Sequence, residues 1–433
     1  MESPAISKYS CLDFWFSVIG VCTYLFDVGS DVWVATEFYS RGDVPWFGVL
    51  VGLMALSSVV VQMFSWYWFK YDRKLEGFNA QNSTDTVLFG NHLKLSGLLH
   101  VFQLGFFCRH ISAIWQGFRV WWRRDQISEY AVYLTHDLSM LRLIETFCES
   151  APQLTLMAYI MLYTNHARTV QCVSVVASTT SIAWMVVDYH RSLRSFLPDK
   201  AKQGWGSSLV YFLWNLLLIA PRVAAVALFT SVLCSYVFVH LLLIWFVMVY
   251  WVWCQKTDFM DSAGGEWLYR ATVGLIWYFS WFNVAEGRTR GNGVIYHSFM
   301  VVDGGILLIT WWWYRDPVLT DSYAPILLAA LPLTYLVGLL FKVLYYCCFH
   351  PKLWRPPVRD TGAIEMPDGQ VSVRAMAPQV GASSQVLNSR MAHHANRFYS
   401  QRDASSTNLI GKTNGRDANS VLQPIANLTV ENE

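Results

Sequence analysis

Predominantly apolar stretches of about 20 residues recur along the first 350 residues of this 433-residue chain. A helix of that length crosses a hydrocarbon core about 30 Å thick. Charged residues make up only 14% of the chain, whereas soluble domains contain roughly 25%. A water-soluble surface could not be covered with so few charges, so the sequence predicts an all-α polytopic membrane protein.

The composition changes at the end of the apolar region. From Pro351 onward the chain is rich in Ser, Asn, Arg and Asp and has no periodic apolar pattern. Such a segment cannot bury enough apolar surface to offset the entropy that folding would cost. We therefore predict a transmembrane domain over residues 1–350 and a disordered tail over residues 351–433.

Ten apolar segments are candidate spans, at residues 11–36, 46–69, 87–108, 139–163, 169–189, 207–232, 235–254, 268–286, 294–314 and 324–348. Segment 87–108 is interrupted by polar residues, and segment 268–286 is short and ends among charges. We expect both to be re-entrant or half-membrane elements, which leaves about eight transmembrane helices. Because each is third in its group of five, an internal pseudo-repeat is a further hypothesis, although no sequence repeat supports it.

Lys and Arg concentrate on one side of this eight-span arrangement. If the N-terminus is inside, the arginine-rich connection from Arg109 to Arg124 also lies inside. Only Arg41, Arg168 and Arg315 then lie outside. Cytoplasmic loops of membrane proteins carry the excess of Lys and Arg, so we predict that both termini are cytoplasmic.

Ionisable residues also occur inside the spans. Each costs about 2.5–3.5 kcal/mol at the centre of a membrane helix, so such residues generally have a function or a partner. Nine of them form the candidate site: Asp13, Asp27, Asp31, Arg142, Glu145, Glu149, Asp188, Arg222 and Asp303.

Helical phase groups most of these residues into stripes. One face of the first helix carries a polar stripe about 27 Å long, made of Asp13, Ser17, Gly20, Tyr24, Asp27 and Asp31. The segment 139–163 carries a second stripe, made of Arg142, Glu145, Glu149 and Gln153. Pro152 predicts a kink in that helix, because proline disrupts the helical hydrogen-bond ladder.

Two interpretations of the stripes remain open and are compatible with each other. The charges can pair as buried salt bridges that fix helix register, with Asp27 or Asp31 bound to Arg142 or Arg222. Alternatively, the stripes form a polar path for the zwitterionic head group of a lipid, while the tails of that lipid stay in the membrane.

Enzyme and metal patterns are missing from the sequence. It contains no Gly-x-Ser-x-Gly nucleophile motif, and its 11 histidines show no zinc-site spacing. The nine cysteines show no Cys-x-x-Cys spacing and lie mostly in or beside apolar runs, so we interpret them as small buried residues. We predict a protein that is not an enzyme and needs no cofactor.

Three pairs of sequence runs resemble the XK-related family. They are Asp137–Phe147 with Ala151–Leu156, Gly206–Leu218 with Pro221–Val223, and Glu266–Arg270 with Tyr278–Gly291. The similarity extends from about residue 10 to residue 351, with these motifs in the same order. It implies bidirectional, ATP-independent phospholipid scrambling in the plasma membrane, which exposes phosphatidylserine on apoptotic cells.

The resemblance also implies two protein partners. One is a caspase that activates the protein by removing the cytosolic tail. The other is a single-pass immunoglobulin-type membrane protein, of the basigin or neuroplastin kind, for surface delivery. Two other functions remain open: a solute transporter coupled by the intramembrane carboxylates, and a scaffold subunit that transports nothing.

The tail contains two aspartates that a caspase could use. We favour Asp368, because the small residue Gly369 follows it in an extended polar segment, and Asp360 is the second choice. Cleavage after Asp368 would release a basic and aromatic cluster that we expect to dock on the cytoplasmic face. Its members are Arg390, His393, His394, Arg397, Phe398 and Tyr399.

Overall fold

The computed structural model describes the apolar region and leaves gaps at several connections. The described residues are 11–72, 93–123, 128–164, 169–196, 203–257, 259–260, 262–282, 284 and 289–350. These residues form helices and short connections, without any strand among them. The all-α fold class predicted from the sequence is therefore confirmed.

The N-terminal half begins with two long helices. They are α1 (Cys11–Arg41) and α2 (Val44–Asp72). Two shorter helices and a long composite helix follow: α5 (Leu93–Val101), α6 (Gly105–Arg123), and the continuous run of α7 (Ser128–Glu145), the π-helix η1 (Thr146–Ser150) and α8 (Ala151–Tyr163).

The C-terminal half contains five long helices and three shorter elements. The long helices are α9 (Thr169–Phe196), α10 (Trp205–Val232), α11 (Tyr236–Cys254), α13 (Thr289–Tyr314) and α15 (Ala324–Leu344). The others are α12 (Ala263–Phe279), α14 (Pro317–Thr320) and the π-helix η2 (Tyr345–Phe349).

Six of these helices are long and apolar enough to cross a membrane, so the chain has the features of a multi-pass membrane protein. They lie in α2, α9, α10, α11, α13 and α15 with η2. The two remaining predicted spans correspond to α1, which has 31 residues, and to the α7–η1–α8 run. Both carry the predicted polar stripes, which lower their mean hydropathy. The total of eight spans stays a prediction.

The two weak segments form shorter elements than the predicted spans. Segment 87–108 contains α5, which has only 9 residues and is about 14 Å long. A turn with Gln103 at a φ of 63° separates it from α6. The 17-residue α12 ends at Ser280, whose backbone is extended. The length of α5 agrees with a half-membrane element, whereas α12, with 17 residues, lies at the lower limit for a complete span.

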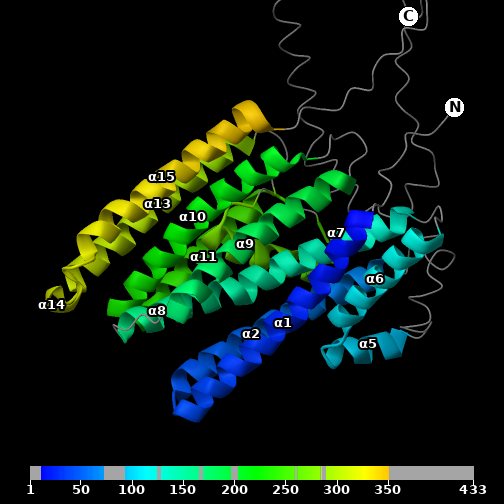
Figure 1. The fold of residues 1–433 in the computed structure, drawn as a ribbon, viewed down its shortest axis with the longest axis horizontal. Coiled ribbons are helices and arrows are strands. Elements are labelled where there is room, and N and C mark those ends of the chain that lie inside the picture. The colour runs from blue at the N-terminus through cyan, green and yellow to red at the C-terminus, as the bar shows by residue number, and fades with distance from the viewer. Residues whose placement is uncertain are drawn as a thin grey trace, which may run out of the picture.

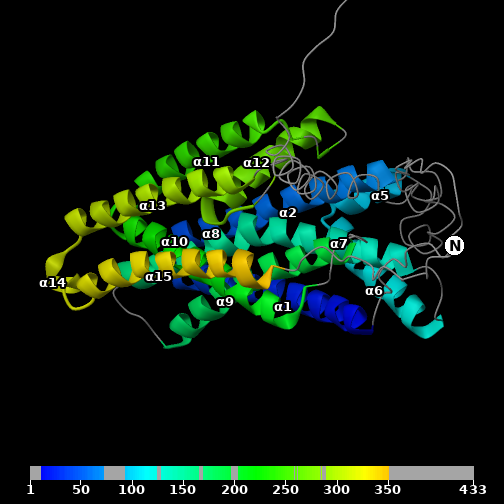
Figure 2. The same cartoon turned by 90° about the horizontal axis from the view of Figure 1, so that it is seen from above.

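The long helices form one bundle around α10, as Figures 1 and 2 show. Helix α10 contacts α8, α9, α13 and α15, and 67% of its apolar window is buried. For α15 the corresponding share is 6%.

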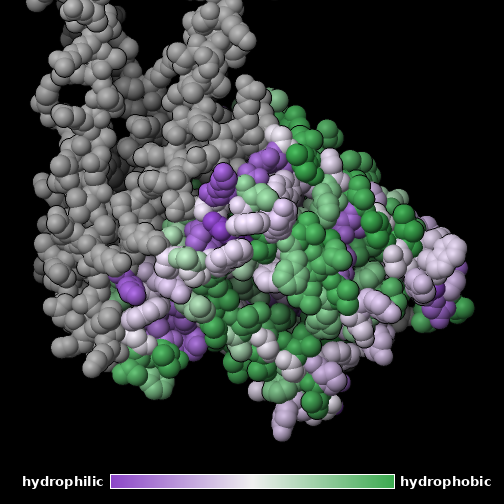
Figure 3. All heavy atoms as spheres, turned by 180° about the vertical axis from the view of Figure 1, so that it is seen from behind, coloured by the Kyte–Doolittle hydropathy of each residue, from purple (hydrophilic) through white to green (hydrophobic). Residues whose placement is uncertain are grey.

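Exposed side chains on outer helices, such as Phe246, Ile309 and Leu340, leave large apolar areas on the surface. Figure 3 shows extensive apolar surface on one face, which suits contact with lipid tails.

The connections that we predicted to lie outside share one end of the bundle. In Figure 1 the turn between α1 and α2, next to Arg41, lies at the lower left, as does α14, next to Arg315. The first turn of α1 and the end of α15 lie toward the opposite end. The eight-span topology requires this arrangement, because it places the connections next to Arg41 and Arg315 on the side opposite to the two termini.

Candidate functional site

The π-helix η1 interrupts the long helix that carries the second polar stripe. The backbone N–H of Ala151 donates to the carbonyl of Thr146, five residues earlier. Pro152 has no N–H, and in a regular α-helix its ring would clash with the carbonyl of Cys148. The wider turn relieves this conflict, so the structure shows a π segment where we predicted a kink. Such segments occur frequently at functional sites.

The two predicted stripes face each other across α1 and the α7–η1–α8 run. Asp31 of α1 is only 4% exposed and accepts a hydrogen bond of 2.5 Å from Nε2 of Gln153. Glu149 lies next to Asp31. The helical phase of the sequence therefore correctly identified two sets of residues that come together in space.

Arg142 fills the space beside α1 at the level of Gly20. A Cβ atom on Gly20 would lie 3.1 Å from Nη1 of Arg142, so the glycine allows the guanidinium to approach the helix. The charge of Arg142 acts on Asp27 and Glu145. The predicted neighbourhood of Asp27 and Arg142 is thus present.

We call six of these residues the polar track: Asp27, Asp31, Arg142, Glu145, Glu149 and Gln153. Within this set the carboxyl groups outnumber the guanidinium. Asp188 of α9 also lies within electrostatic range of Arg142. The polar track therefore offers carboxyl oxygens as hydrogen-bond acceptors to a cationic group and a guanidinium to an anionic one.

The polar track is open toward the side of α1. Asp27 is exposed, whereas Asp31 one turn further along is buried. Large apolar side chains next to Asp27 are exposed as well, including Phe26 at 78%. A polar surface that continues directly into apolar surface can contact the head group and the tails of the same lipid.

Arg222 and Asp303 form a separate buried ion pair between α10 and α13. Nε of Arg222 donates to the carbonyl of Tyr278 over 2.9 Å, and the guanidinium lies 4.6 Å from the centre of the Tyr278 ring. His240 of α11 lies 3.0 Å from Asp303 Oδ1 through Nε2, and 3.0 Å from the Tyr278 hydroxyl through Nδ1. These contacts tie α10, α11, α12 and α13 together.

The ion pair corrects one prediction. We had considered Arg222, as an alternative to Arg142, for the partner of Asp27 or Asp31, but the carboxylate partner of Arg222 is Asp303. Helix α10 packs directly against α13, so Arg222 meets the acidic residue of that neighbour. No sequence pattern distinguished His240 or Tyr278, since a single polar aromatic residue in an apolar run is usually part of the core.

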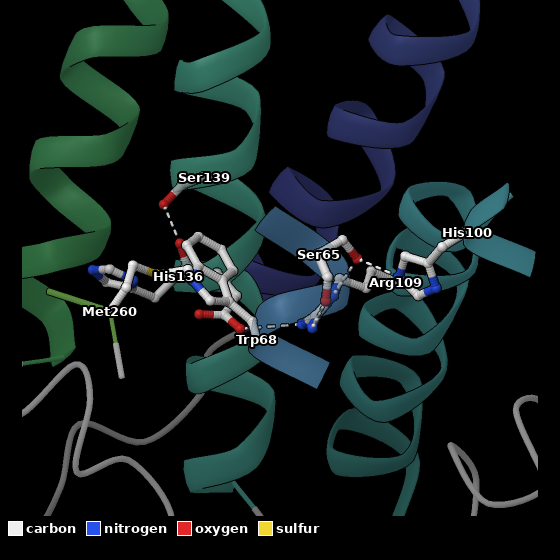
Figure 4. Close-up of polar contacts among 8 residues, drawn as sticks. Ser65, Trp68, His100, Arg109, His136, Ser139 and Met260 are labelled. Atoms are coloured by element: carbon white, nitrogen blue, oxygen red, sulfur yellow. Dashed lines mark hydrogen bonds and ion pairs between the residues drawn. The ribbon is translucent and has the colours of Figure 1, made fainter. Parts of the chain in front are cut away.

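A third cluster, shown in Figure 4, joins α2, α5, α6 and α7. Arg109 Nη1 lies 3.1 Å from Asp137 Oδ2. Its Nε donates to Ser65 Oγ over 2.8 Å, and its Nη2 donates to the Ser65 carbonyl over 3.0 Å. Ser65 Oγ also lies 3.0 Å from His100 Nε2. We had used Arg109 only to orient the chain, so sequence reasoning missed this cluster.

Several predicted site residues lie outside the described residues. Asp13 belongs to α1, but its side chain is not described. The two candidate cleavage residues, Asp360 and Asp368, and the whole docking cluster also lie outside. That cluster comprises Arg390, His393, His394, Arg397, Phe398 and Tyr399.

Comparison with known proteins places the membrane region in a family. A family model described as XK-related protein matches residues 15–351. The chain belongs to the XK-related family. The resemblance seen in the three pairs of sequence runs is thereby confirmed, and the match ends where the polar tail begins.

Three relatives carry the name XK-related protein 8. The protein from Gasterosteus aculeatus is 69% identical over 402 residues, which are 92% of this chain and 100% of the relative. The one from Tetraodon nigroviridis is 69% identical over 404 residues, with 93% and 100% covered. The one from Pan troglodytes is 39% identical over 395 residues, with 89% and 94% covered.

Proposed function

We propose that this protein moves phospholipids between the two leaflets of the plasma membrane in both directions and without ATP. The observation that carries the proposal is the polar track, which runs beside exposed apolar side chains of α1. Membership of the XK-related family is consistent with it. The proposed result is exposure of phosphatidylserine on apoptotic cells.

The polar track would lower the barrier for the head group of a lipid. Carboxyl oxygens of Asp27, Glu145 and Glu149 would accept hydrogen bonds from the ammonium group of a head group, and Arg142 would attract its phosphate. The fatty acid tails remain in the bilayer beside the apolar surface of α1. Because no step consumes energy, lipids would move in both directions along their own gradients.

We further propose that cleavage of the tail after Asp368, or after Asp360, activates the protein. The released cluster would otherwise dock on the cytoplasmic face. Both termini would be cytoplasmic, and a single-pass immunoglobulin-type partner would support delivery to the plasma membrane. A polar, extended segment is a favourable protease substrate, which supports this part of the proposal.

Reconstitution into vesicles with fluorescent phospholipids in both leaflets tests the proposal. A membrane-impermeant quencher reaches only the outer leaflet unless lipids cross. With the tail-trimmed protein we expect quenching to proceed from about half of the fluorescence to nearly all of it. A solute transporter would leave the inner half protected while moving a soluble substrate, and a scaffold would do neither. Either result would contradict the proposal.

A pair of glycine variants on α1 tests the role of the polar track in this assay. Gly20→Leu places a side chain against Arg142, because even a Cβ atom would lie 3.1 Å from its Nη1. Gly29→Leu is the matched control on the same helix, since a Cβ there meets nothing within 4 Å among the described residues. We expect Gly20→Leu to slow scrambling several-fold and Gly29→Leu to leave it unchanged. Equal rates for the two variants would exclude the polar track as the path.

A further inference from the structure

Two adjacent cysteines lie in the last helical turn before the tail. Cys347 and Cys348 belong to η2, and both are exposed. The sequence had suggested that the cysteines are buried apolar residues. Among the described residues this prediction is wrong for these two and also for Cys22, Cys172, Cys234 and Cys254, which are exposed. No other two cysteines are neighbours in the sequence.

Tyr345 fixes the direction in which the two thiols point. It is 1% exposed, and its ring centre lies 4.9 Å from that of Trp214 and 5.3 Å from that of Tyr211, both on α10. A π-helix closes its hydrogen bonds over five residues, so two or three residues beyond Tyr345 correspond to about half a turn. Cys347 and Cys348 therefore face away from the bundle.

The thiols continue the lipid-facing surface of α15. Only 6% of the apolar window that includes α15 and η2 is buried. Leu340, Val343 and Leu344 on the preceding turns are 67%, 60% and 41% exposed. Just beyond η2 the sequence continues with Lys352, Trp354 and Arg355. Basic and aromatic residues at the end of a span are typical of the cytoplasmic membrane interface.

We propose that Cys347 and Cys348 are S-acylated with long-chain fatty acids. Cysteines next to the membrane on its cytoplasmic side are the usual substrates of this modification. The inference rests on the cytoplasmic orientation of the tail given under the proposed function. Acylation would insert the acyl chains beside α15 and hold the start of the tail at the inner leaflet.

The reaction needs only a long-chain acyl thioester of coenzyme A and a membrane acyltransferase. The cysteine sulfur attacks the carbonyl carbon of the acyl group and forms a new thioester. The bond between that carbon and the sulfur of coenzyme A breaks, and coenzyme A leaves as its thiol with the proton from the cysteine. No oxidation or reduction takes place.

A mass-tag exchange experiment on the full-length protein in animal cells tests this inference. Free thiols are blocked with N-ethylmaleimide, thioesters are cleaved with hydroxylamine, and the released thiols are tagged with a polyethylene glycol maleimide. We expect a hydroxylamine-dependent shift of two tags, which Cys347→Ser/Cys348→Ser abolishes. Cys172→Ser/Cys234→Ser is the control, because these cysteines are also exposed but lie in the first turn of α9 and in the connection between α10 and α11, both of which the predicted topology places outside.

Four results would overturn the inference or separate it from the proposed function. No hydroxylamine-dependent shift, or a full shift in Cys347→Ser/Cys348→Ser, would overturn it. Labelling of Cys347 and Cys348 by an impermeant thiol reagent on intact cells would also overturn it, because the two thiols would then lie outside the cell. If the shift is present but reconstituted vesicles show no scrambling, acylation is supported and the proposed function fails.

Discussion

At the scale of single residues, burial decides how much an ion pair contributes. Arg41 and Glu37 form a pair on the surface of α1, with side chains 50% and 43% exposed. Arg222 and Asp303 form the same kind of pair with 4% and 8% exposed. An exposed pair contributes about 0–1 kcal/mol, whereas removal of one partner of a buried pair leaves an uncompensated charge.

This contrast predicts the effect of Arg222→Gln. The substitution leaves Asp303 with His240 as its remaining neighbour, so we expect the free energy of unfolding to fall by about 3–5 kcal/mol. Thermal unfolding of the purified protein in detergent measures the effect, and Glu37→Gln is the control, with a loss below about 1 kcal/mol. The double variant Arg222→Met/Asp303→Leu should be more stable than Arg222→Gln. Equal stability of Arg222→Gln and the control would show that the pair is not desolvated.

Asp31 and Asp27 on α1 differ in burial, so we expect their replacement by Ala to have different effects on surface expression and on scrambling. Asp31 is buried and hydrogen-bonded to Gln153, so Asp31→Ala leaves the half-buried amide of Gln153 without this acceptor. We expect lower amounts of this variant at the cell surface. Asp27 is exposed, so Asp27→Ala should reach the surface in normal amounts and scramble more slowly. Surface biotinylation and annexin binding measure the two quantities. Normal amounts and normal scrambling for both variants would place the polar track outside the lipid path.

At the scale of helices, close approach of backbones holds the centre of the bundle together. Gly338 of α15 lies against α10, where a Cβ atom would come within 2.9 Å of Leu218 Cδ2 and 3.1 Å of the backbone carbon of Leu217. Small residues at such positions let membrane helices pack closely. Helix α15 is otherwise mostly exposed, so this contact is important for its position.

Gly338→Val should therefore weaken the packing of α15 on α10. Overpacking of this kind typically costs about 1–3 kcal/mol, so we expect a lower midpoint in thermal unfolding. Gly305→Val on α13 is the matched control, because a Cβ at Gly305 meets nothing within 4 Å among the described residues. An unchanged midpoint for Gly338→Val would mean that α15 can shift away from α10 at little cost.

The helical period was sufficient to predict the residues of the polar track but not all their partners. Asp31 and Gln153 are 122 residues apart in sequence, yet each could be assigned to a polar stripe from phase alone. Arg222 and Asp303, 81 residues apart, depend on which helices pack together, and periodicity contains no such information. The same holds for His240 and Tyr278, whose roles arise only from the contacts of α11 and α12.

At the scale of the whole molecule, the two ends of the bundle differ in their basic residues. The connection predicted to be inside between α6 and α7 contains Arg124, and Arg119 and Arg123 lie at the end of α6. The turn between α1 and α2, at the opposite end in Figure 1, contains only Gly42 and Asp43. The distribution of charge along the sequence thus has a spatial counterpart.

Cysteine labelling on intact cells tests this orientation. A cysteine introduced by Gln126→Cys should resist an impermeant thiol reagent, because the Lys and Arg distribution places it inside. Asp43→Cys, in the turn between α1 and α2, should react readily and serves as the positive control. Labelling above the level of the unmodified protein defines reaction, since native cysteines are also exposed. Ready labelling of Gln126→Cys would exclude the eight-span topology.

The tail provides the last prediction, because its cleavage would leave every helix of the bundle intact. Cleavage after Asp368 would release residues 369–433 with the docking cluster. Loss of the connection would lower the local concentration of that cluster at the cytoplasmic face. We therefore expect Asp368→Ala to stay full length and inactive after caspase treatment, and a chain that ends at Asp368 to scramble lipids without caspase. Gel mobility and the vesicle assay measure these outcomes.

The two parts of this prediction can fail independently. If Asp368→Ala is still cut and activated, Asp360→Ala becomes the informative variant, because Asp360 precedes the same docking cluster. If the chain that ends at Asp368 remains inactive in vesicles that contain phosphatidylserine, release of the tail is not sufficient. In that case the resting state must be held by contacts within the bundle, and the ion pair of Arg222 and Asp303 is the first place to test, since it joins α10 to α13.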